Sequence, residues 1–357
     1  MPPNVLKAEK IKMKKTIYFF ALFLAAFVIR ANAQTETKYF SGTIGEARVQ
    51  MILQRNGGDL KGTYYYVKVG KNLNLSGSVD EGNFTLTEKN ANGAKTGEFS
   101  GRWSKEEGIE NHSLSGEWKN PAKTKTLDFY LTEEMMFFTK GANLKPKSFS
   151  ETNKTKLFEM SAEYPEITGV EPSIEAKFNL LAKNKVMNEI AKFRKDFLAQ
   201  TAEDLKFFKE YDRTNSVEIS YSIAHADDKI VSISFGNYYD TGGAHPNGYS
   251  FTLNFDLKTG RELTLADLFK PNSNYLKVVS DYSIKNLKET FNEDADDEWI
   301  KTGAGADAKN FRSWNVTKQG LEIKFDSYQV APYVAGPQEV VIPFEDLKSV
   351  LRADFSV

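Results

Sequence analysis

The sequence reads LKGTY at residues 60–64, FSGRW at residues 99–103 and LSGEW at residues 114–118. In each phrase a glycine precedes an aromatic residue by two positions. Side chains of a β-strand alternate between its two faces, so the glycine and the ring share one face. A ring that covers a glycine, or a backbone that bends there, suits a strongly curved sheet or a small barrel. The three phrases therefore indicate an all-β fold for this part of the chain.

The region around these phrases, residues 39–132, contains short alternating runs and no helical periodicity. Turn signals such as Asn56-Gly57-Gly58 and Asp80-Glu81-Gly82 separate the runs. Because tight turns join the strands, each strand is expected to pair with its sequence neighbour in a meander, which forms a domain over residues 34–135. The expected strands are residues 47–54, 60–69, 73–79, 83–88, 97–103, 113–118 and 126–131.

A meander of seven or eight strands is long enough to close into a barrel. Such a barrel either holds a small ligand, as lipocalins do, or is filled by its own side chains. No convergent set of polar residues is visible in this region, which favours a filled interior. A small-ligand carrier stays open as an alternative function.

The first 33 residues have the pattern of a secretory signal peptide. Lys12, Lys14 and Lys15 precede an apolar run over residues 17–29, and Ala31-Asn32-Ala33 supplies the small residues of a cleavage site. The apolar run of about 13 residues is shorter than the roughly 20 that span a bilayer as a helix. We expect cleavage before Gln34, a periplasmic or secreted protein, and no stable membrane span after cleavage. An uncleaved membrane anchor is the alternative.

Charge and cysteine content exclude several classes of function. The 357 residues include 47 basic and 48 acidic ones, a net charge of −1 that gives no reason to expect nucleic acid as a partner. The first 33 residues hold six basic residues and one acidic residue, so the chain from Gln34 has 41 basic and 47 acidic residues, net −6. The absence of cysteine excludes disulfides, thiolate metal sites and a cysteine nucleophile.

The second half of the sequence has a different texture. Residues 136–154, rich in lysine, serine and asparagine, are typical of a linker. Apolar residues then recur at three- and four-residue steps from Ile174 to Phe197, which predicts a helix over residues 173–201. Further helices are expected over residues 274–291 and 344–351. Strands are expected over residues 217–224, 230–238, 249–256, 262–265, 311–317, 321–325 and 339–342.

This pattern of helices and hairpins predicts an α+β domain over residues 155–357. Its sheet is expected to be antiparallel, with helices packed on one face and the other face free. The whole chain is therefore expected to be a mixed protein of two domains.

The histidines carry little recognisable chemistry. They are His112, His225 and His245, and His245 lies in a polar loop with the adjacent glycines Gly242 and Gly243. An acid/base or metal site pairing His245 with Asp240, and with His225 or Asp228, is one hypothesis. The spacings that place two ligands on one element are absent, so the alternative, loop hydrogen bonds made by His245, is favoured. We expect no metal and no cofactor.

Several ordered motifs in residues 155–355 resemble a known domain. They are Gly242-Gly243-Ala244-His245-Pro246, Phe255-Asp256-Leu257-Lys258-Thr259-Gly260, Tyr328-Gln329-Val330-Ala331-Pro332-Tyr333 and Val340-Val341-Ile342-Pro343-Phe344. Together they resemble the C-terminal domain shared by the anti-sigma factor RsiV and the deacetylase PdaC. Tyr164-Pro165-Glu166-Ile167 and the helix after it resemble the companion domain that precedes it. The N-terminal β region is not covered.

The resemblance implies an extracytoplasmic binding module. RsiV-type domains bind lysozyme, whereas the chemistry of PdaC belongs to a separate deacetylase domain. This sequence shows neither a cytoplasmic sigma-binding segment with a membrane span nor a deacetylase domain with its metal-binding motif, so neither signalling nor deacetylation is carried over.

We therefore expect an exported, non-catalytic envelope protein that binds a lysozyme-like protein or cell-wall glycan. An enzyme that acts on envelope glycan through Asp240 and His245 is the alternative. Tyrosine, glycine and proline supply rigid contacts at low entropic cost. The expected binding surface consists of Tyr238, Tyr239, Gly242, Gly243, His245, Pro246, Tyr249, Tyr328 and Tyr333.

Overall fold

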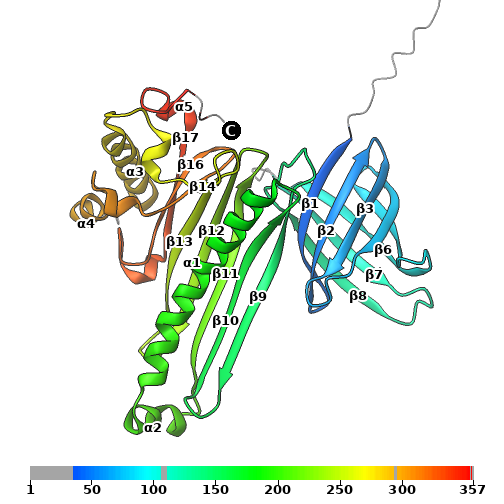
Figure 1. The fold of residues 1–357 in the computed structure, drawn as a ribbon, viewed down its shortest axis with the longest axis horizontal. Helices are drawn as coiled ribbons and strands as arrows, with labels where there is room; N and C mark the ends of the chain where they lie inside the picture. Colours follow the sequence, from blue (N-terminus) through cyan, green and yellow to red (C-terminus); the bar gives the residue numbers. More distant parts are fainter. Residues whose placement is uncertain (1–34, 106–110, 293–295, 354, 356–357) are drawn as a thin grey trace, which may run out of the picture. The chain divides into compact units, whose positions relative to one another are not determined.

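The computed structural model describes residues 35–105, 111–292, 296–353 and 355 (Figure 1). The expected signal peptide, residues 1–33, lies outside the described residues. The described chain is mostly β, with five α-helices among its elements, so the mixed fold class expected from the sequence is confirmed.

The N-terminal region is a closed antiparallel barrel of eight strands in sequence order. Each strand pairs with the next, and the first strand pairs with the eighth to close the barrel. The meander is thus confirmed, with one strand, β1, beyond those expected. The strands are β1 (Glu36–Ile44), β2 (Ala47–Asn56), β3 (Asp59–Tyr66), β4 (Leu73–Asp80), β5 (Asn83–Lys89), β6 (Lys95–Lys105), β7 (His112–Lys119) and β8 (Thr126–Glu133).

Aromatic rings fill the barrel interior. The Phe99 ring lies edge-on to Tyr64, with centroids 5.4 Å apart, and to Phe129, with centroids 5.3 Å apart. The buried carboxylate of Glu88 accepts hydrogen bonds from the Tyr64 hydroxyl at 2.5 Å and from Trp118 Nε1 at 2.7 Å. A buried charge of this kind needs such partners. An interior packed with rings speaks against the small-ligand carrier.

The C-terminal region is built on a six-stranded sheet in the order β14-β13-β12-β11-β10-β9 (Figure 1). Four of its five strand pairs are antiparallel, but β10 and β11 run parallel. The expectation of a wholly antiparallel sheet is corrected at this pair, because the helical connection between the two strands returns the chain to the same end of the sheet. The strands are β9 (Asn143–Asn153), β10 (Phe158–Thr168), β11 (Asn215–Ala226), β12 (Ile230–Asp240), β13 (Asn247–Asp256) and β14 (Arg261–Glu262).

The linker expected over residues 136–154 is corrected by β9. This strand pairs with β10 along its whole length, from Asn143 opposite Thr168 to Asn153 opposite Phe158. Leu144 is buried, whereas most of the polar residues after it are exposed or half-buried. An edge strand tolerates this composition because lysines protect its open edge from unwanted pairing.

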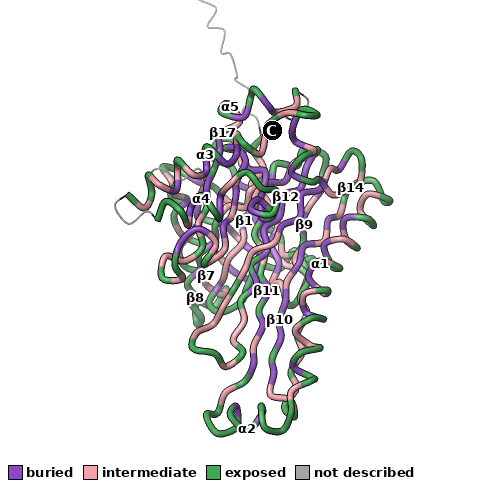
Figure 2. Tube along the Cα trace, turned by 90° about the vertical axis from the view of Figure 1, so that its left-hand side faces the viewer, coloured by how far each residue is buried: buried purple, intermediate pink, exposed green. Residues whose placement is uncertain are grey.

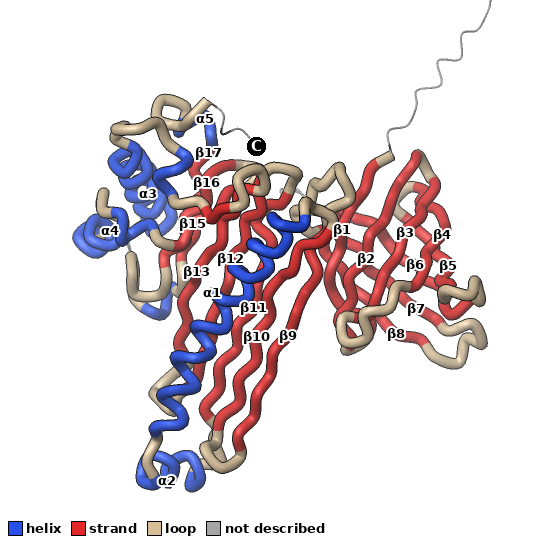
Figure 3. Tube along the Cα trace, in the orientation of Figure 1, coloured by secondary structure: helices blue, strands red, loops and turns tan. Residues whose placement is uncertain are grey.

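Helix α1 (Pro172–Ala199) lies along one face of this sheet, as Figure 3 shows. Its buried residues are Phe178, Ala182, Val186, Ile190 and Phe197, so they follow the stripe of three- and four-residue steps read from the sequence. The Glu171 side chain caps the helix by accepting hydrogen bonds from the backbone of Ser173 and Ile174. Figure 2 shows exposed residues on the outward side of α1 and on the short helix α2 (Ala202–Glu210) that follows.

The opposite face of the sheet is covered over β11 to β13, so the expectation of a free face is corrected for this part of the sheet. A three-stranded sheet of β15 (Ser313–Val316), β16 (Gly320–Phe325) and β17 (Gln338–Pro343) packs there through β15. Its outer side carries α3 (Tyr275–Phe291) and α5 (Phe344–Leu347), and α3 also contacts α4 (Asp297–Gly303). Short 3-10 helices are η1 (Leu265–Leu268), η3 (Ala308–Phe311) and η4 (Tyr333–Ala335).

Buried hydrogen bonds join the two sheets. The Asn254 amide donates to the Trp314 carbonyl at 2.8 Å, and the Ser232 hydroxyl donates to Asn254 Oδ1 at 2.6 Å. The Asn315 amide and the Val316 N–H in turn donate to the Ser232 hydroxyl at 2.9 and 3.0 Å. These directional contacts fix where the second sheet sits on the first.

Phe178→Ala tests the packing of α1. Phe178 is fully buried and its ring lies 5.3 Å from that of Phe255, so its removal is expected to cost about 3–5 kcal/mol of unfolding free energy. Leu180→Ala on the same helix is the control, because Leu180 is 61% exposed and its loss should cost about 0.5 kcal/mol or less. Urea unfolding measures both, and equal losses would contradict this packing.

Candidate functional site

Two loops, distant in sequence, meet at one end of the stacked sheets. Residues 241–246 connect β12 to β13, and residues 326–337 connect β16 to β17. The His245 ring stacks on the Tyr333 ring with centroids 4.0 Å apart and an angle of 23°. The Tyr333 hydroxyl donates a hydrogen bond of 2.7 Å to the carbonyl of Pro246. One tyrosine thus holds the glycine-rich loop by both its ring and its hydroxyl.

Tyr328 extends this contact. Its ring lies 5.5 Å from the Tyr333 ring, its hydroxyl is 3.5 Å from His245 Nε2, and 51% of the residue is exposed. Its carbonyl accepts a hydrogen bond from Trp299 Nε1 at 3.0 Å. The backbone of Tyr328 has φ +70°, a conformation that a bulky residue adopts only when its surroundings enforce it. We call His245, Pro246, Tyr328 and Tyr333 the tyrosine–histidine surface.

Loop contacts occupy the His245 ring. Nδ1 lies 2.8 Å from the Pro246 carbonyl, a distance at which a protonated Nδ1 donates to that oxygen. The ring face is covered by Tyr333, and Nε2 faces the Tyr328 hydroxyl. These are the loop hydrogen bonds that the sequence favoured for His245, and they present the ring as part of a fixed surface.

Asp240 has other partners. Arg213 Nη2 lies 2.9 and 2.8 Å from its two carboxylate oxygens, and the Gly242 N–H donates to Oδ1 at 2.9 Å. The hydrogen bond from Gly242 and the Arg213 guanidinium hold the pKa of Asp240 below its usual value. In the described part of the chain, Asp240 and His245 share no hydrogen bond. The geometry therefore does not assemble them into an acid/base pair.

The remaining histidines lie elsewhere. His225 Nε2 is 3.3 Å from Asp227 near the start of β12, and Asp228 accepts a hydrogen bond from the Thr139 backbone. Strand β12 separates that end from Asp240 by about 33 Å at 3.3 Å per residue. His112 contacts Glu133 in the barrel. No group of three or more acidic or histidine side chains suited to a metal occurs among the described residues.

Tyrosines of β12 and β13 are divided between the two faces of the sheet. Tyr239 packs against Phe193 of α1 with ring centroids 5.0 Å apart, and the Tyr249 hydroxyl donates to Glu189 of α1 at 2.6 Å. Tyr238, next in the alternation, is 53% exposed. Tyr239 and Tyr249 thus support the sheet–helix interface behind the site, and Tyr238 stays available at its surface.

Position 242 requires a glycine because helix α2 packs closely against the loop. It has φ +81°, and a Cβ added there would lie 2.8 Å from Cζ of Phe208 in α2. Gly243 meets no such neighbour, since the nearest atom to its Cβ position is 3.8 Å away. Only the first glycine of the pair is therefore fixed by packing. Neither α2 nor the role of Trp299 on α4 was predictable from the sequence, because both helices are too short to show a recognisable period.

Two family models match this region of the chain. A model described as deacetylase PdaC matches residues 151–248, and a model described as a protein of unknown function, DUF3298, matches residues 266–345. The first includes the His245 loop and ends in β13, and the second contains Tyr328 and Tyr333. The PdaC part of the resemblance seen in the sequence is confirmed, while the likeness to RsiV stays a prediction.

Curated relatives share parts of the chain. The peptidoglycan-N-acetylmuramic acid deacetylase PdaC of Bacillus subtilis is 31% identical over 143 residues, which are 40% of this chain and 31% of the relative. The match thus spans about a third of that enzyme. Immunogenic protein MPT64 of Mycobacterium tuberculosis is 24% identical over 164 residues, 46% of this chain and 70% of the relative.

Solved structures give weaker likenesses. A DUF3298 family protein from Bacteroides fragilis has a TM-score of 0.47 and 17% identity, and the match covers 60% of this chain and 95% of that one. A second, from Pseudomonas aeruginosa, has a TM-score of 0.44 and 17% identity, over 60% and 94% of the two chains. Within the described residues, no helix is both long and apolar enough to cross a membrane.

Gly242→Ala tests how the loop is held. The substitution combines a left-handed backbone with a clash against Phe208. Gly336→Ala is the control: Gly336 has φ +67° and ψ −173° but open space around its Cβ position, so it should cost only the backbone strain of about 1–3 kcal/mol. We expect Gly242→Ala to lower the unfolding free energy by more than this. Equal losses in urea unfolding would show that Phe208 does not restrain the loop.

Proposed function

We propose that this chain is an exported, non-catalytic binding protein of the cell envelope, and that the tyrosine–histidine surface binds a lysozyme-like protein. The observation that carries the proposal is the stack of His245 on Tyr333, which joins two loops into one aromatic surface whose most exposed residue is Tyr328, at 51%. The choice of partner comes from the resemblance of the sequence to RsiV-type domains, which bind lysozyme.

The surface has the properties of a protein-binding site. Tyrosines dominate the binding energy of many interfaces because a large ring is ordered at little entropic cost. Here both residues are already held: the Tyr333 hydroxyl is bonded to the Pro246 carbonyl, and Trp299 Nε1 is bonded to the Tyr328 backbone carbonyl. A surface that is ordered before binding loses less entropy when the partner arrives.

An envelope location is supported by two observations. The first 33 residues have the pattern of a signal peptide, and the relative PdaC is named for an action on peptidoglycan. Cell-wall glycan is accordingly the alternative ligand. The likeness to PdaC leaves the enzyme alternative open, although in the described part of the chain Asp240 is bound to Arg213 and His245 to its own loop.

Calorimetry with lysozyme tests the proposal. We expect saturable binding with a dissociation constant below about 100 μM, a weak-affinity bound. Tyr333→Ala should weaken it by about 30-fold, the loss that corresponds to a hot-spot residue. Tyr130→Ala is the control, because Tyr130 of the barrel is a 51% exposed tyrosine that lies outside the surface. Absence of binding at 100 μM, or an equal effect of both variants, would refute the lysozyme version.

Ionic strength gives a second test. The chain from Gln34 carries a net charge of −6, which attracts a basic partner over a distance. Because salt screens such attraction beyond about 8 Å at 0.15 M, the association rate should fall between low and physiological salt. Stopped-flow mixing measures this rate. A rate that does not change with salt would show that long-range charge attraction does not speed the association.

A further inference from the structure

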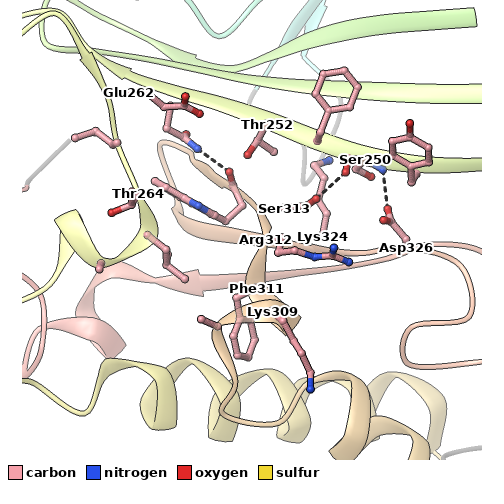
Figure 4. Close-up of a pocket in the computed structure, with 18 of the residues that line it drawn as sticks. Ser250, Thr252, Glu262, Thr264, Lys309, Phe311, Arg312, Ser313, Lys324 and Asp326 are labelled. Atoms are coloured by element: carbon pink, nitrogen blue, oxygen red, sulfur yellow. Dashed lines mark hydrogen bonds between the residues drawn. The ribbon is translucent and has the colours of Figure 1, made fainter. Parts of the chain in front are cut away.

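A second site lies in a cavity of about 1000 Å³ beside the outer edge of β13 (Figure 4). One wall is β13 with the chain after β14, and the other is the segment from η3 to β15. Its volume is at the upper end for small-ligand sites. The family matches assign no function to this cavity, and the cavity lies outside the tyrosine–histidine surface.

The edge of β13 is covered at two positions within this cavity. At Ser250, the N–H donates to Asp326 at 2.7 Å and the carbonyl accepts from the Ser313 hydroxyl at 2.8 Å, as Figure 4 shows. At Asn254, the carbonyl accepts from the Leu263 N–H at 2.7 Å. At both ends of the stretch from Ser250 to Asn254, protein groups therefore make the hydrogen bonds that a neighbouring strand would otherwise make.

Thr252, which is only 9% exposed, lies between them with its outward backbone edge not hydrogen-bonded within the described chain. Backbone groups of alternate residues point to the same side of a strand, so the N–H and carbonyl of Thr252 face away from β12, as those of Ser250 do. Strand β14 pairs only with Phe255 and Asp256 before the chain turns into η1. Among the described residues no strand or side chain bonds the Thr252 backbone at this edge. One donor and one acceptor thus face the cavity together.

That pair of groups matches one residue of an extended peptide. In an antiparallel ladder, two opposed residues exchange both of their hydrogen bonds. A saccharide offers no such repeated pair, whereas peptides commonly bind by adding a strand to an open edge. The covered positions at Ser250 and Asn254 are about 13 Å apart at 3.3 Å per residue, which leaves room for about three residues.

Charges at the two ends of the cavity fix the direction of such a peptide. An antiparallel peptide ends near Ser250, where the exposed Arg312 lines the cavity and its charge also acts on Asp326. It begins near Asn254, on the side of Glu262, whose carboxylate is 2.7 Å from Lys185. Guanidinium groups bind carboxylates through two parallel hydrogen bonds. We propose that this cavity binds a short extended peptide of about three residues, with its backbone on Thr252 and its terminal carboxylate on Arg312.

Titration with tri-alanine peptides tests the proposal. Trialanine with a free carboxylate is expected to bind about tenfold more tightly than its C-terminal amide, the ratio expected for one charge-assisted hydrogen bond. In ¹⁵N–¹H spectra, the Thr252 amide should shift saturably. Cellotriose and chitotriose serve as saccharide arms. A saccharide that binds while the peptides do not would overturn the peptide assignment, and so would a Thr252 amide that stays unchanged.

Two variants separate the contacts. Thr252→Pro removes the N–H that faces the cavity and leaves the ladder to β12 intact, so it should abolish peptide binding. Arg312→Gln leaves the backbone edge of Thr252 unchanged. It should reduce the tenfold preference for trialanine with a free carboxylate over its amide to about one. Lys270→Gln, outside the cavity, should change neither peptide binding nor the preference for the free carboxylate. A preference that survives Arg312→Gln refutes the carboxylate contact, even if the proline variant fails to fold.

This inference does not depend on the lysozyme proposal, because the two sites use different residues. Tyr333→Ala is expected to keep trialanine binding, and Arg312→Gln is expected to keep lysozyme binding. Loss of trialanine binding in Tyr333→Ala would contradict the independence of the two sites.

Discussion

The buried contact of Ser232, Asn254 and Asn315 determines how the C-terminal region is assembled. These polar residues lie between two sheets, where polar groups are costly unless they are hydrogen-bonded. Ser232 and Asn254 bind each other and the β15 backbone, so sliding one sheet over the other would break several buried bonds at once. The Asn315 amide donates to Ser232, while its Oδ1 has no partner among the described residues. Apolar packing alone would not fix this register so narrowly.

Both proposed sites follow from that register. It brings Asp326, at the end of β16, to the backbone of Ser250 on β13. Residues 326–337 then continue across to the loop of residues 241–246, where Tyr333 meets His245 and Pro246. On the other side of Ser250 the same arrangement leaves Thr252 facing a cavity. Both proposals rely on groups that the fold holds in position: aromatic rings at the first site, and the Thr252 backbone with Arg312 at the second.

Much of the fold was predictable because local chemistry agrees with the tertiary structure. Turn residues separate the barrel strands, and the apolar stripe of α1 matches its buried face. Strand β1 was missed because Tyr39 and Phe40 are adjacent and both buried, which breaks the two-residue alternation. Strand β9 was missed because a sequence rich in lysine, serine and asparagine is also typical of a linker. The second sheet layer was missed because Ser232 and Asn254 look like surface residues, yet their buried bonds make them an interface. Tyrosine, glycine and proline marked both loops of the site, but no local signal shows that the loops meet.

The central claim is that the tyrosine–histidine surface is where a protein partner binds. Aromatic ¹³C–¹H spectra of the chain from Gln34, recorded while lysozyme is added, test it most directly. The account predicts saturable shifts of His245, Tyr328 and Tyr333, with Tyr130 of the barrel unchanged. Shifts confined to residues outside the two loops, or no saturable shift at all, would contradict it.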